Sequence, residues 1–275
     1  MMIKEFAAFS DLEWLDALSI DRGKYTHLLP ALPPESEQKR FTGKSGRDAF
    51  AESVSFLSLV LELARERGVE LDASSRILDL GCGWGRISQT AYRDFAPHNI
   101  LSIDIHEDAI GICRRTGLAT TLIHASPETP TILRTGVADI AVAYSVFSHL
   151  SEEAHWNWLR ELHRLVRPGG IVVVTTRTRA MITYVQSLRE QPDLPPHAAG
   201  LIEAFSNVGK TLESYDNGEY IFGVPRTTGV FANIYGEAAI PPLYVEREWT
   251  KSFRDVAYLG TKGLNSSQAI IVCTT

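Results

Sequence analysis

The chain has 275 residues, of which 44% are hydrophobic and 22% are charged, within the usual range of a globular protein. Its formal net charge is -6 and no cluster of five or more Lys and Arg residues is present, so nucleic acid is a poor candidate substrate. No apolar stretch reaches the ~20 residues of a membrane span or forms a secretion signal. We therefore expect a cytoplasmic protein that acts without a nucleic-acid or membrane partner.

The three cysteines, Cys82, Cys113 and Cys273, are far apart and odd in number, which is typical of reduced thiols. The eight histidines show none of the familiar metal-ligand spacings. The sequence thus predicts no disulfide and no bound metal. It sets no expectation for the oligomeric state.

Residues 1–75 are expected to form a helical N-terminal extension that packs on the core. Within 48–67, apolar residues recur at spacings of three and four, which places them on one face of a long helix. These residues are Phe50, Val54, Leu57, Leu61 and Ala64. Gly68 is a suitable stop for this helix. Residues 21–47, with several Pro and Gly, are expected to be irregular.

Short apolar runs alternate with helix-length segments over 76–178, which predicts βαβ units and a parallel sheet with helices on both faces. The expected helices include one at 151–166, for which Ser151 is a good N-cap. Pro168, Gly169 and Gly170 are expected to break the chain before the next strand. The expected strands are 77–78, 100–103, 122–123, 140–143 and 171–174.

The pattern changes after Arg177, and we interpret 179–245 as an insertion. It contains a helical stretch near 180–190, a break at 191–197 and two β-like runs at 220–222 and 230–232. The last part of the chain, 246–275, holds two runs at 255–259 and 268–272. Their short connection leaves no room for a helical crossover, which predicts an antiparallel pair that closes the sheet.

A glycine loop carries the strongest chemical signal. Asp79 is followed by glycines at 81, 83 and 85, which allow the backbone to approach a ligand closely before a helix begins. Asp104 ends the next expected strand, where its carboxylate can accept hydrogen bonds from ribose hydroxyls. The Gly-x-Gly-x-Gly spacing differs from the dinucleotide fingerprint Gly-x-Gly-x-x-Gly, so we expect another nucleoside cofactor.

These features resemble the class I S-adenosylmethionine-dependent methyltransferase family. The first motif, the acid at the end of the next strand and the segment 162–170, Leu-His-Arg-Leu-Val-Arg-Pro-Gly-Gly, carry the resemblance. It implies an α/β, Rossmann-like fold with a seven-stranded, mostly parallel sheet and an antiparallel final strand. The segments 81–86 and 144–150 are also similar to bacterial members that act on sugars or other small metabolites.

The resemblance implies S-adenosyl-L-methionine as the cofactor and S-adenosyl-L-homocysteine as the product. Asp104, with Ile105 beside it, would contact the ribose, and Ala125 and Ser126 would lie near the adenine. Ser126 departs from the Asp that many family members carry there. The residues implied near the methionine portion are Asp79, Gly81, Cys82 and Gly83, and those implied to line the methyl-transfer cleft are Tyr144 and Ser145.

Each candidate for catalysis or acceptor binding has an alternative interpretation. His149, which with Tyr144 is predicted to be catalytic, either acts as a general base or packs under the helix that starts at Ser151. Arg177 either orients an anionic acceptor or is solvated. Tyr220 and Tyr235 either stack on the acceptor or fill a small core of the insertion. Cys82 is expected to be buried rather than nucleophilic, because no basic partner is evident.

The sequence therefore predicts methyl transfer to a small molecule, with a hydroxyl group as the favoured acceptor. No Asn-Pro-Pro-Tyr-like tetrapeptide, typical of many amino-group methylations, follows the fourth strand. The alternatives are N-methylation of a small molecule and a scaffold protein that binds S-adenosylmethionine without turnover. Residues 21–47 and 179–245 are expected to form a lid and acceptor pocket.

Overall fold

The computed structural model describes residues 3, 5–191, 193–194, 198–226, 233–261 and 267–275. The chain divides into two compact units. Of the described residues, the first unit contains those up to Val142 and Arg164–Ile171. The second consists of Ala143–His163, Val172–Lys262 and Ser267–Thr275.

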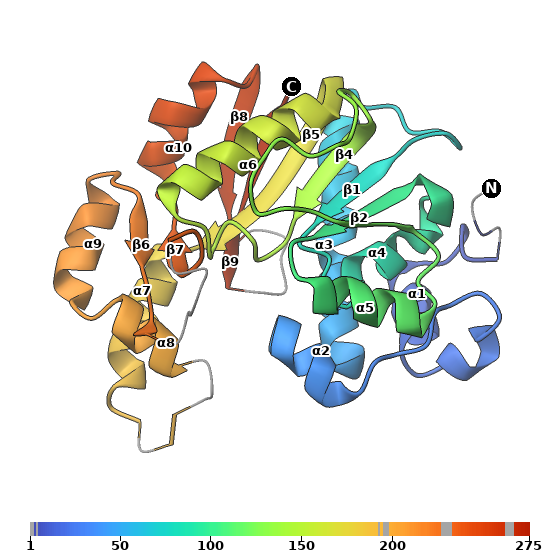
Figure 1. The fold of residues 1–275 in the computed structure, drawn as a ribbon, viewed down its shortest axis with the longest axis horizontal. Helices are drawn as coiled ribbons and strands as arrows, with labels where there is room; N and C mark the ends of the chain where they lie inside the picture. The colour runs from blue at the N-terminus through green and yellow to red at the C-terminus, as the bar shows by residue number, and fades with distance from the viewer. Residues whose placement is uncertain (1–2, 4, 192, 195–197, 227–232, 262–266) are drawn as a thin grey trace. The chain divides into compact units, whose positions relative to one another are not determined.

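Among the described residues, seven strands form one sheet in the order β3-β2-β1-β4-β5-β9-β8 (Figure 1). β1 pairs in parallel with β2 and β4, β2 pairs in parallel with β3, and β8 pairs antiparallel with β9. This confirms the predicted mostly parallel sheet and its antiparallel closing pair. The bounds are β1 Ile77–Leu80, β2 Ile100–Asp104, β3 Thr121–His124, β4 Ala138–Ala143, β5 Val166–Arg177, β8 Asp255–Gly260 and β9 Gln268–Thr274.

β5 begins earlier than the sequence predicted. The expected break at Pro168, Gly169 and Gly170 lies inside the strand, so that prediction was wrong. A Cβ atom at Gly170 would lie 2.5 Å from the carbonyl oxygen of Asp139. The glycine therefore permits a close backbone approach within the strand, and its presence does not mark the end of the preceding connection.

The helices of the first unit include the long α3, whose apolar face is buried as predicted. α2 corrects the expectation that 21–47 is irregular: its N-cap is Pro34, and Gly43 ends it in the left-handed conformation with a φ of 70°. The bounds are α1 Asp11–Leu18, η1 Arg22–Tyr25, α2 Glu35–Thr42, α3 Gly46–Glu66, α4 Arg86–Thr90, η2 Ala91–Arg93, η3 Pro97–Asn99 and α5 Glu107–Thr116.

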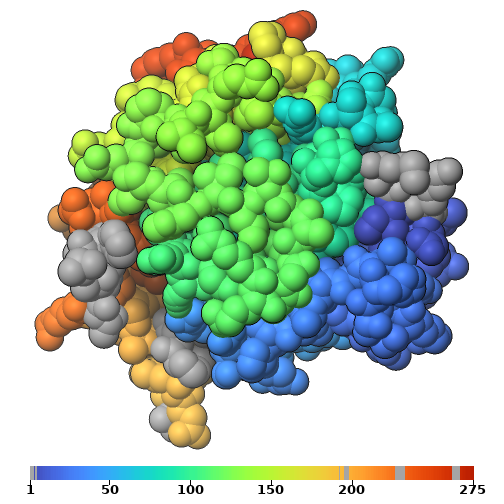
Figure 2. Space-filling view, turned by 45° about the vertical axis from the view of Figure 1, so that its right-hand side comes forward, coloured from blue at the N-terminus to red at the C-terminus, as the bar shows by residue number. Residues whose placement is uncertain are grey.

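α2 lies against α5. Arg40 pairs with Asp108 at 2.6 Å and Glu37 with Arg115 at 3.4 Å. Figure 2 shows the blue N-terminal segment bordering the green segment that follows in the first unit. The N-terminal extension is thus part of the same compact unit as the glycine loop.

The second unit is more helical than the sequence predicted. Ser151 caps α6 as expected, because its hydroxyl oxygen accepts a hydrogen bond from the Ala154 amide at 3.3 Å. The run at 220–222 matches β6, whereas 230–232 lies outside the described residues. The bounds are α6 Glu152–Leu165, α7 Arg179–Leu188, α8 Ala198–Ala204, α9 Val208–Asp216, β6 Ile221–Gly223, β7 Glu237–Ala239, α10 Pro242–Glu248 and η5 Trp249–Lys251.

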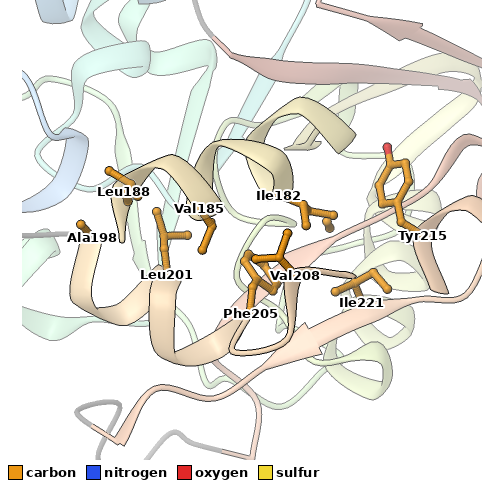
Figure 3. Close-up of a cluster of buried hydrophobic side chains, with 10 residues drawn as sticks. Ile182, Val185, Leu188, Ala198, Leu201, Phe205, Val208, Tyr215 and Ile221 are labelled. Carbon is orange, nitrogen blue, oxygen red and sulfur yellow. The ribbon is translucent and has the colours of Figure 1, made fainter. Parts of the chain in front are cut away.

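The insertion has a hydrophobic core of its own (Figure 3). Side chains from α7, α8, α9 and β6 point toward one another, and they include the fully buried Ile182, Val185 and Leu188. Burial of such side chains contributes about 1.5–3 kcal/mol each relative to exposure.

In the described part of the chain, no helix combines the length and apolar character needed to cross a bilayer.

Candidate functional site

The glycine loop leaves the carboxyl end of β1 and crosses to β2. The amides of Gly81 and Cys82 both donate to the carbonyl of Ile103, at 2.8 and 3.0 Å. Gly81, Gly83 and Gly85 have φ values of 72°, 54° and 84°. A side chain is strained in that backbone region, so the loop needs glycine at these positions. The path brings the backbone amide of Gly83 to Asp104.

Asp104 is the last residue of β2 and is 5% exposed. One carboxylate oxygen accepts from the Gly83 amide at 2.8 Å, and the other accepts from the His106 amide at 2.9 Å. The two bonds fix the orientation of the carboxylate. Because each carboxylate oxygen can accept more than one hydrogen bond, Asp104 can still accept hydrogen bonds from the hydroxyls of a ligand.

Asp79 lies in β1 and is 2% exposed. It accepts a hydrogen bond from the Ser88 hydroxyl at 2.6 Å. Burial raises the pKa of Asp79 to about 6, with a further rise from the charge of Asp104, while the Ser88 hydrogen bond and Arg86 oppose the increase. Two buried carboxyl groups with different surroundings, Asp79 on β1 and Asp104 at the end of β2, thus lie next to the loop.

Cys82 is buried, and its pKa is raised well above the ordinary value, first by a hydrogen bond with Cys113 and then by desolvation. The Cys113 thiol lies 3.3 Å from the carbonyl oxygen of Gly83. A thiol in this environment is a poor nucleophile. Its surroundings agree with the expectation that Cys82 has a packing role.

The residues predicted near ribose and adenine follow β2 and β3. The Ala125 amide donates to the Asp104 carbonyl at 2.9 Å, and the His124 ring donates to the Ile105 carbonyl at 3.1 Å. The Ser126 hydroxyl oxygen accepts from the Glu128 amide at 3.2 Å. One backbone hydrogen bond and one from the His124 side chain therefore join the end of β3 and the residue after it to Asp104 and Ile105.

Phe41 is a neighbour of the loop that the sequence did not single out. A Cβ atom built at Gly83 would lie 3.4 Å from its ring. Phe41 belongs to α2, and the Arg40 guanidinium lies 4.6 Å from the centre of its ring. Phe41 was missed because nothing in the pattern of 21–47 indicated that a helix would bring it to the loop.

The turn after β4 belongs to the second unit. Ser145 has a φ of 61°, a conformation that non-glycine residues rarely adopt. Its amide donates to the Thr175 hydroxyl oxygen at 2.7 Å, and its own hydroxyl lies 3.4 Å from that of Ser148. Tyr144 precedes it and is 8% exposed. Strained backbone of this kind clusters at functional sites, which favours the predicted role of this turn.

His149 lies in a polar cluster of the second unit. Its Nδ1 donates to the Gly236 carbonyl at 2.8 Å, so the lone pair of the neutral ring is on Nε2. Nε2 is 3.5 Å from Arg177 Nη2. Burial, and then the charge of Arg177, lower the pKa of His149 to about 3. At neutral pH the ring is therefore uncharged and weakly basic.

Arg177 is 8% exposed and pairs with the Glu237 carboxylate. It also donates to the Ala238 carbonyl at 3.3 Å. Burial lowers the pKa of Arg177 and raises that of Glu237. Arg177 is thus in a buried ion pair and is not solvated at the end of the strand, which leaves orientation of an acceptor as a prediction.

Two tyrosines of the insertion flank this region. The Tyr235 ring stacks on His149 with centroids 4.9 Å apart, and Tyr235 is 37% exposed. The Tyr220 hydroxyl donates to the Leu150 carbonyl at 2.9 Å, and its ring contacts His155. Tyr220 also lines a cavity of about 290 Å³ between α9 and β6, with Lys210, Phe222, Ala204, Ser206, Asn207, Thr211, Ser214 and Ile221.

Comparisons with known proteins agree with this geometry. Residues 77–170 match the family model described as "Methyltransferase domain". The ubiquinone biosynthesis O-methyltransferase of Aromatoleum aromaticum is 31% identical over 117 residues, which cover 41% of this chain and 48% of that protein. The chain therefore spans about half the length of the curated relatives it matches.

Two solved structures share the fold. DesVI of Streptomyces venezuelae is 17% identical with a TM-score of 0.54, and the match covers 88% of this chain and 98% of that one. A methyltransferase from Clostridium acetobutylicum, described as S-adenosylmethionine-dependent, is 13% identical with a TM-score of 0.52 and coverages of 92% and 98%. At these identities, both similarities show a shared fold and nothing more.

Proposed function

Because the chain belongs, through residues 77–170, to the class I S-adenosylmethionine-dependent methyltransferases, we propose that it transfers a methyl group to a hydroxyl of a small molecule. The observation that carries the proposal is the Asp104 carboxylate, fixed by the loop amide of Gly83 and the amide of His106. The oxygen acceptor is supported by the name of the curated relative, an O-methyltransferase.

The residues of the first unit fit the cofactor. Asp104 would bind the ribose hydroxyls, and the buried Asp79 would face the cationic methionine portion. Gly81 and Gly83, with their positive φ values, would allow close backbone approach. Ser126 would lie beside the adenine with Ala125, and its hydroxyl oxygen, which accepts from the Glu128 amide, keeps a second lone pair that could accept from the adenine amine.

S-adenosylmethionine, when bound, supplies an activated methyl group on a sulfonium. The protein then has to align the acceptor oxygen and exclude water. We assign alignment to Tyr144 and Ser145, in the strained turn after β4. The weak basicity of His149 at neutral pH favours the packing alternative over the general base, and the approach of its Nε2 to Arg177 suits a ring that holds that side chain.

The insertion is the proposed acceptor region. It supplies Tyr235, Gly236 and Glu237 to the His149 cluster, and it contains the cavity lined by Tyr220. An exposed tyrosine ring that stacks on a second ring is suited to contact a sugar or aromatic acceptor. Support for an acceptor function therefore rests on contacts within the second unit.

The proposal is tested by calorimetric titration with S-adenosylhomocysteine, followed by assay of methyl transfer to a library of hydroxyl compounds. Asp104→Ala should weaken binding by about tenfold to a hundredfold, because hydrogen bonds to a charged group contribute about 1.5–3 kcal/mol. Asp108→Ala removes a surface acid of α5 and should leave binding unchanged.

Unchanged affinity in a folded Asp104→Ala protein would contradict the ribose assignment. Tight cofactor binding without methyl transfer to any hydroxyl compound would contradict the proposed reaction and favour a scaffold protein or a nitrogen acceptor.

A further inference from the structure

A chain of three hydroxyl groups leads from Asp79 toward the protein surface. Ser88 of α4 lies 2.6 Å from the Asp79 carboxylate, Ser102 of β2 lies 2.7 Å from Ser88, and Thr120 lies 2.7 Å from Ser102, all measured between oxygens. Ser88 and Ser102 are fully buried, and Thr120 is half-buried. The chain thus connects a buried carboxyl group with the edge of the first unit.

The direction of the hydrogen bonds follows from the charge of Asp79. An ionised carboxylate only accepts, so Ser88 must donate its proton to Asp79. The oxygen of Ser88 is then free to accept from Ser102, whose oxygen accepts from Thr120. Hydroxyls aligned in this way polarise one another, so each bond strengthens the next toward the carboxylate.

Burial is the main influence that disfavours the ionised form of Asp79, and charged groups act on it in both directions. Asp104, from β2, disfavours its ionised form, whereas Arg86, from α4, favours it. Arg86 is itself bound to Glu52 of α3 at 2.9 Å, and Glu52 also pairs with Lys44 at 2.7 Å. Among the influences that favour the ionised form, the hydrogen bond from the Ser88 hydroxyl is the largest, so the hydroxyl chain is placed to affect the charge of Asp79.

We propose that Ser88 and Ser102 are positioning residues that keep Asp79 ionised and oriented, so that the site selects ligands with the cationic amino group of methionine. The inference rests on the proposed function. On deprotonation, the proton of Asp79 passes to Ser88 while Ser88 passes its own to Ser102. The same exchange repeats at Thr120, which releases one proton to water, so that only the carboxyl group changes its charge.

Two ligands separate the parts of the site. S-adenosylhomocysteine carries the amino acid portion, whereas 5′-methylthioadenosine has the same nucleoside and no amino group. Both are titrated calorimetrically between pH 5 and pH 8. Affinity for S-adenosylhomocysteine should fall up to tenfold per pH unit below about 6, because the proton on Asp79 removes one negative charge. Affinity for 5′-methylthioadenosine should stay constant.

Ser88→Ala should move the midpoint of this decline upward by about one pH unit, since a hydrogen bond to a charged group is lost. Ser102→Ala and Thr120→Val, which break the chain farther away, should move it in the same direction by progressively smaller amounts. Thr120 is half-buried, and valine is close to threonine in volume, so Thr120→Val should fold. It therefore tests the hydroxyl chain if the Ser88→Ala protein does not fold. Ser53→Ala removes a buried hydroxyl bound to Thr90 and should not move the midpoint.

The inference is overturned if folded Ser88→Ala or Thr120→Val gives the wild-type midpoint, or if 5′-methylthioadenosine shows the same pH dependence. Failure of the wild-type protein to bind S-adenosylhomocysteine at any pH would instead overturn the proposed function.

Discussion

The contacts that hold Asp104 in the first unit join residues at most 21 positions apart, whereas the His149 ring of the second unit is held by a carbonyl 87 positions away. The glycine loop is thus built from one strand-loop-helix segment and the next strand. The His149 cluster is built from the turn after β4, the end of β5 and the insertion. A site of the first kind leaves a compact motif in the sequence, and a site of the second kind does not.

The two sites also differ in how their charges are used. The Asp104 carboxylate accepts from backbone amides, which are neutral donors, so its negative charge is available to a ligand. The charge of Arg177 is already matched by Glu237 inside the second unit. This contrast supports the proposal that Asp104 binds a ligand directly, and it leads us to predict that the Arg177–Glu237 ion pair stabilises the insertion.

Gly83→Val gives the largest expected effect and tests whether the loop must approach its ligand by backbone alone. At a φ of 54° a branched side chain is strained, and its Cβ would lie 3.4 Å from the Phe41 ring. We expect S-adenosylhomocysteine binding to fall below detection by calorimetry, with the circular dichroism spectrum retained.

Gly117→Val is the matched control, because Gly117 has a φ of 77° with open space around it at the end of α5. It should lose stability and keep binding. Binding by Gly83→Val at the wild-type affinity would remove the distinction between the loop and an ordinary tight turn.

Glu237→Leu tests whether the buried ion pair of Arg177 and Glu237 stabilises the second unit. Removal of one member of a buried ion pair leaves the other charge unmatched and costs about 3–5 kcal/mol in free energy of unfolding. Arg177→Met in the same chain should restore much of the loss, because both charges are then gone. Urea unfolding of the single and double variants measures this.

The surface pair of Arg179 and Asp216 supplies the control, since both side chains are about half exposed. Asp216→Asn should change the urea midpoint little. A Glu237→Leu variant as stable as Asp216→Asn would show that the buried pair does not hold the insertion.

The sequence predicted the sheet, the glycine loop and the position of Asp104, because strand periodicity and turn glycines act over a few residues. It expected irregular chain where α2 lies, and it made no helix prediction for the segments that form α8, α9 and α10. Their helices are short, at seven to nine residues, and gain stability mainly from packing such as that in Figure 3. Phe41 and Glu237 were missed for the same reason: their neighbours come from distant parts of the chain.

The smallest expected effect is on how the free energy of unfolding depends on pH. Asp79 of the first unit and His149 of the second should change this free energy in opposite directions as the pH rises. Burial raises the pKa of Asp79 to about 6, so its contribution to stability is present below its unfolded pKa and is lost as pH rises through 6. Burial lowers the pKa of His149 to about 3, so its contribution is present above its unfolded pKa and is lost as pH falls from about 6.5 toward 3.

His149→Phe keeps the ring that stacks on Tyr235 and removes the titrating nitrogens, so unfolding should become less sensitive to acid. The unfolding equilibrium constant should change up to tenfold less per pH unit between pH 6 and pH 4 than in the wild type. His155, whose pKa burial also lowers to about 3, keeps its own share of the slope in both proteins. Urea unfolding at pH 4, 5, 6 and 7 makes the comparison. Parallel profiles for the two proteins would mean that His149 titrates normally in the folded state, and the general base would then be the better account of this residue.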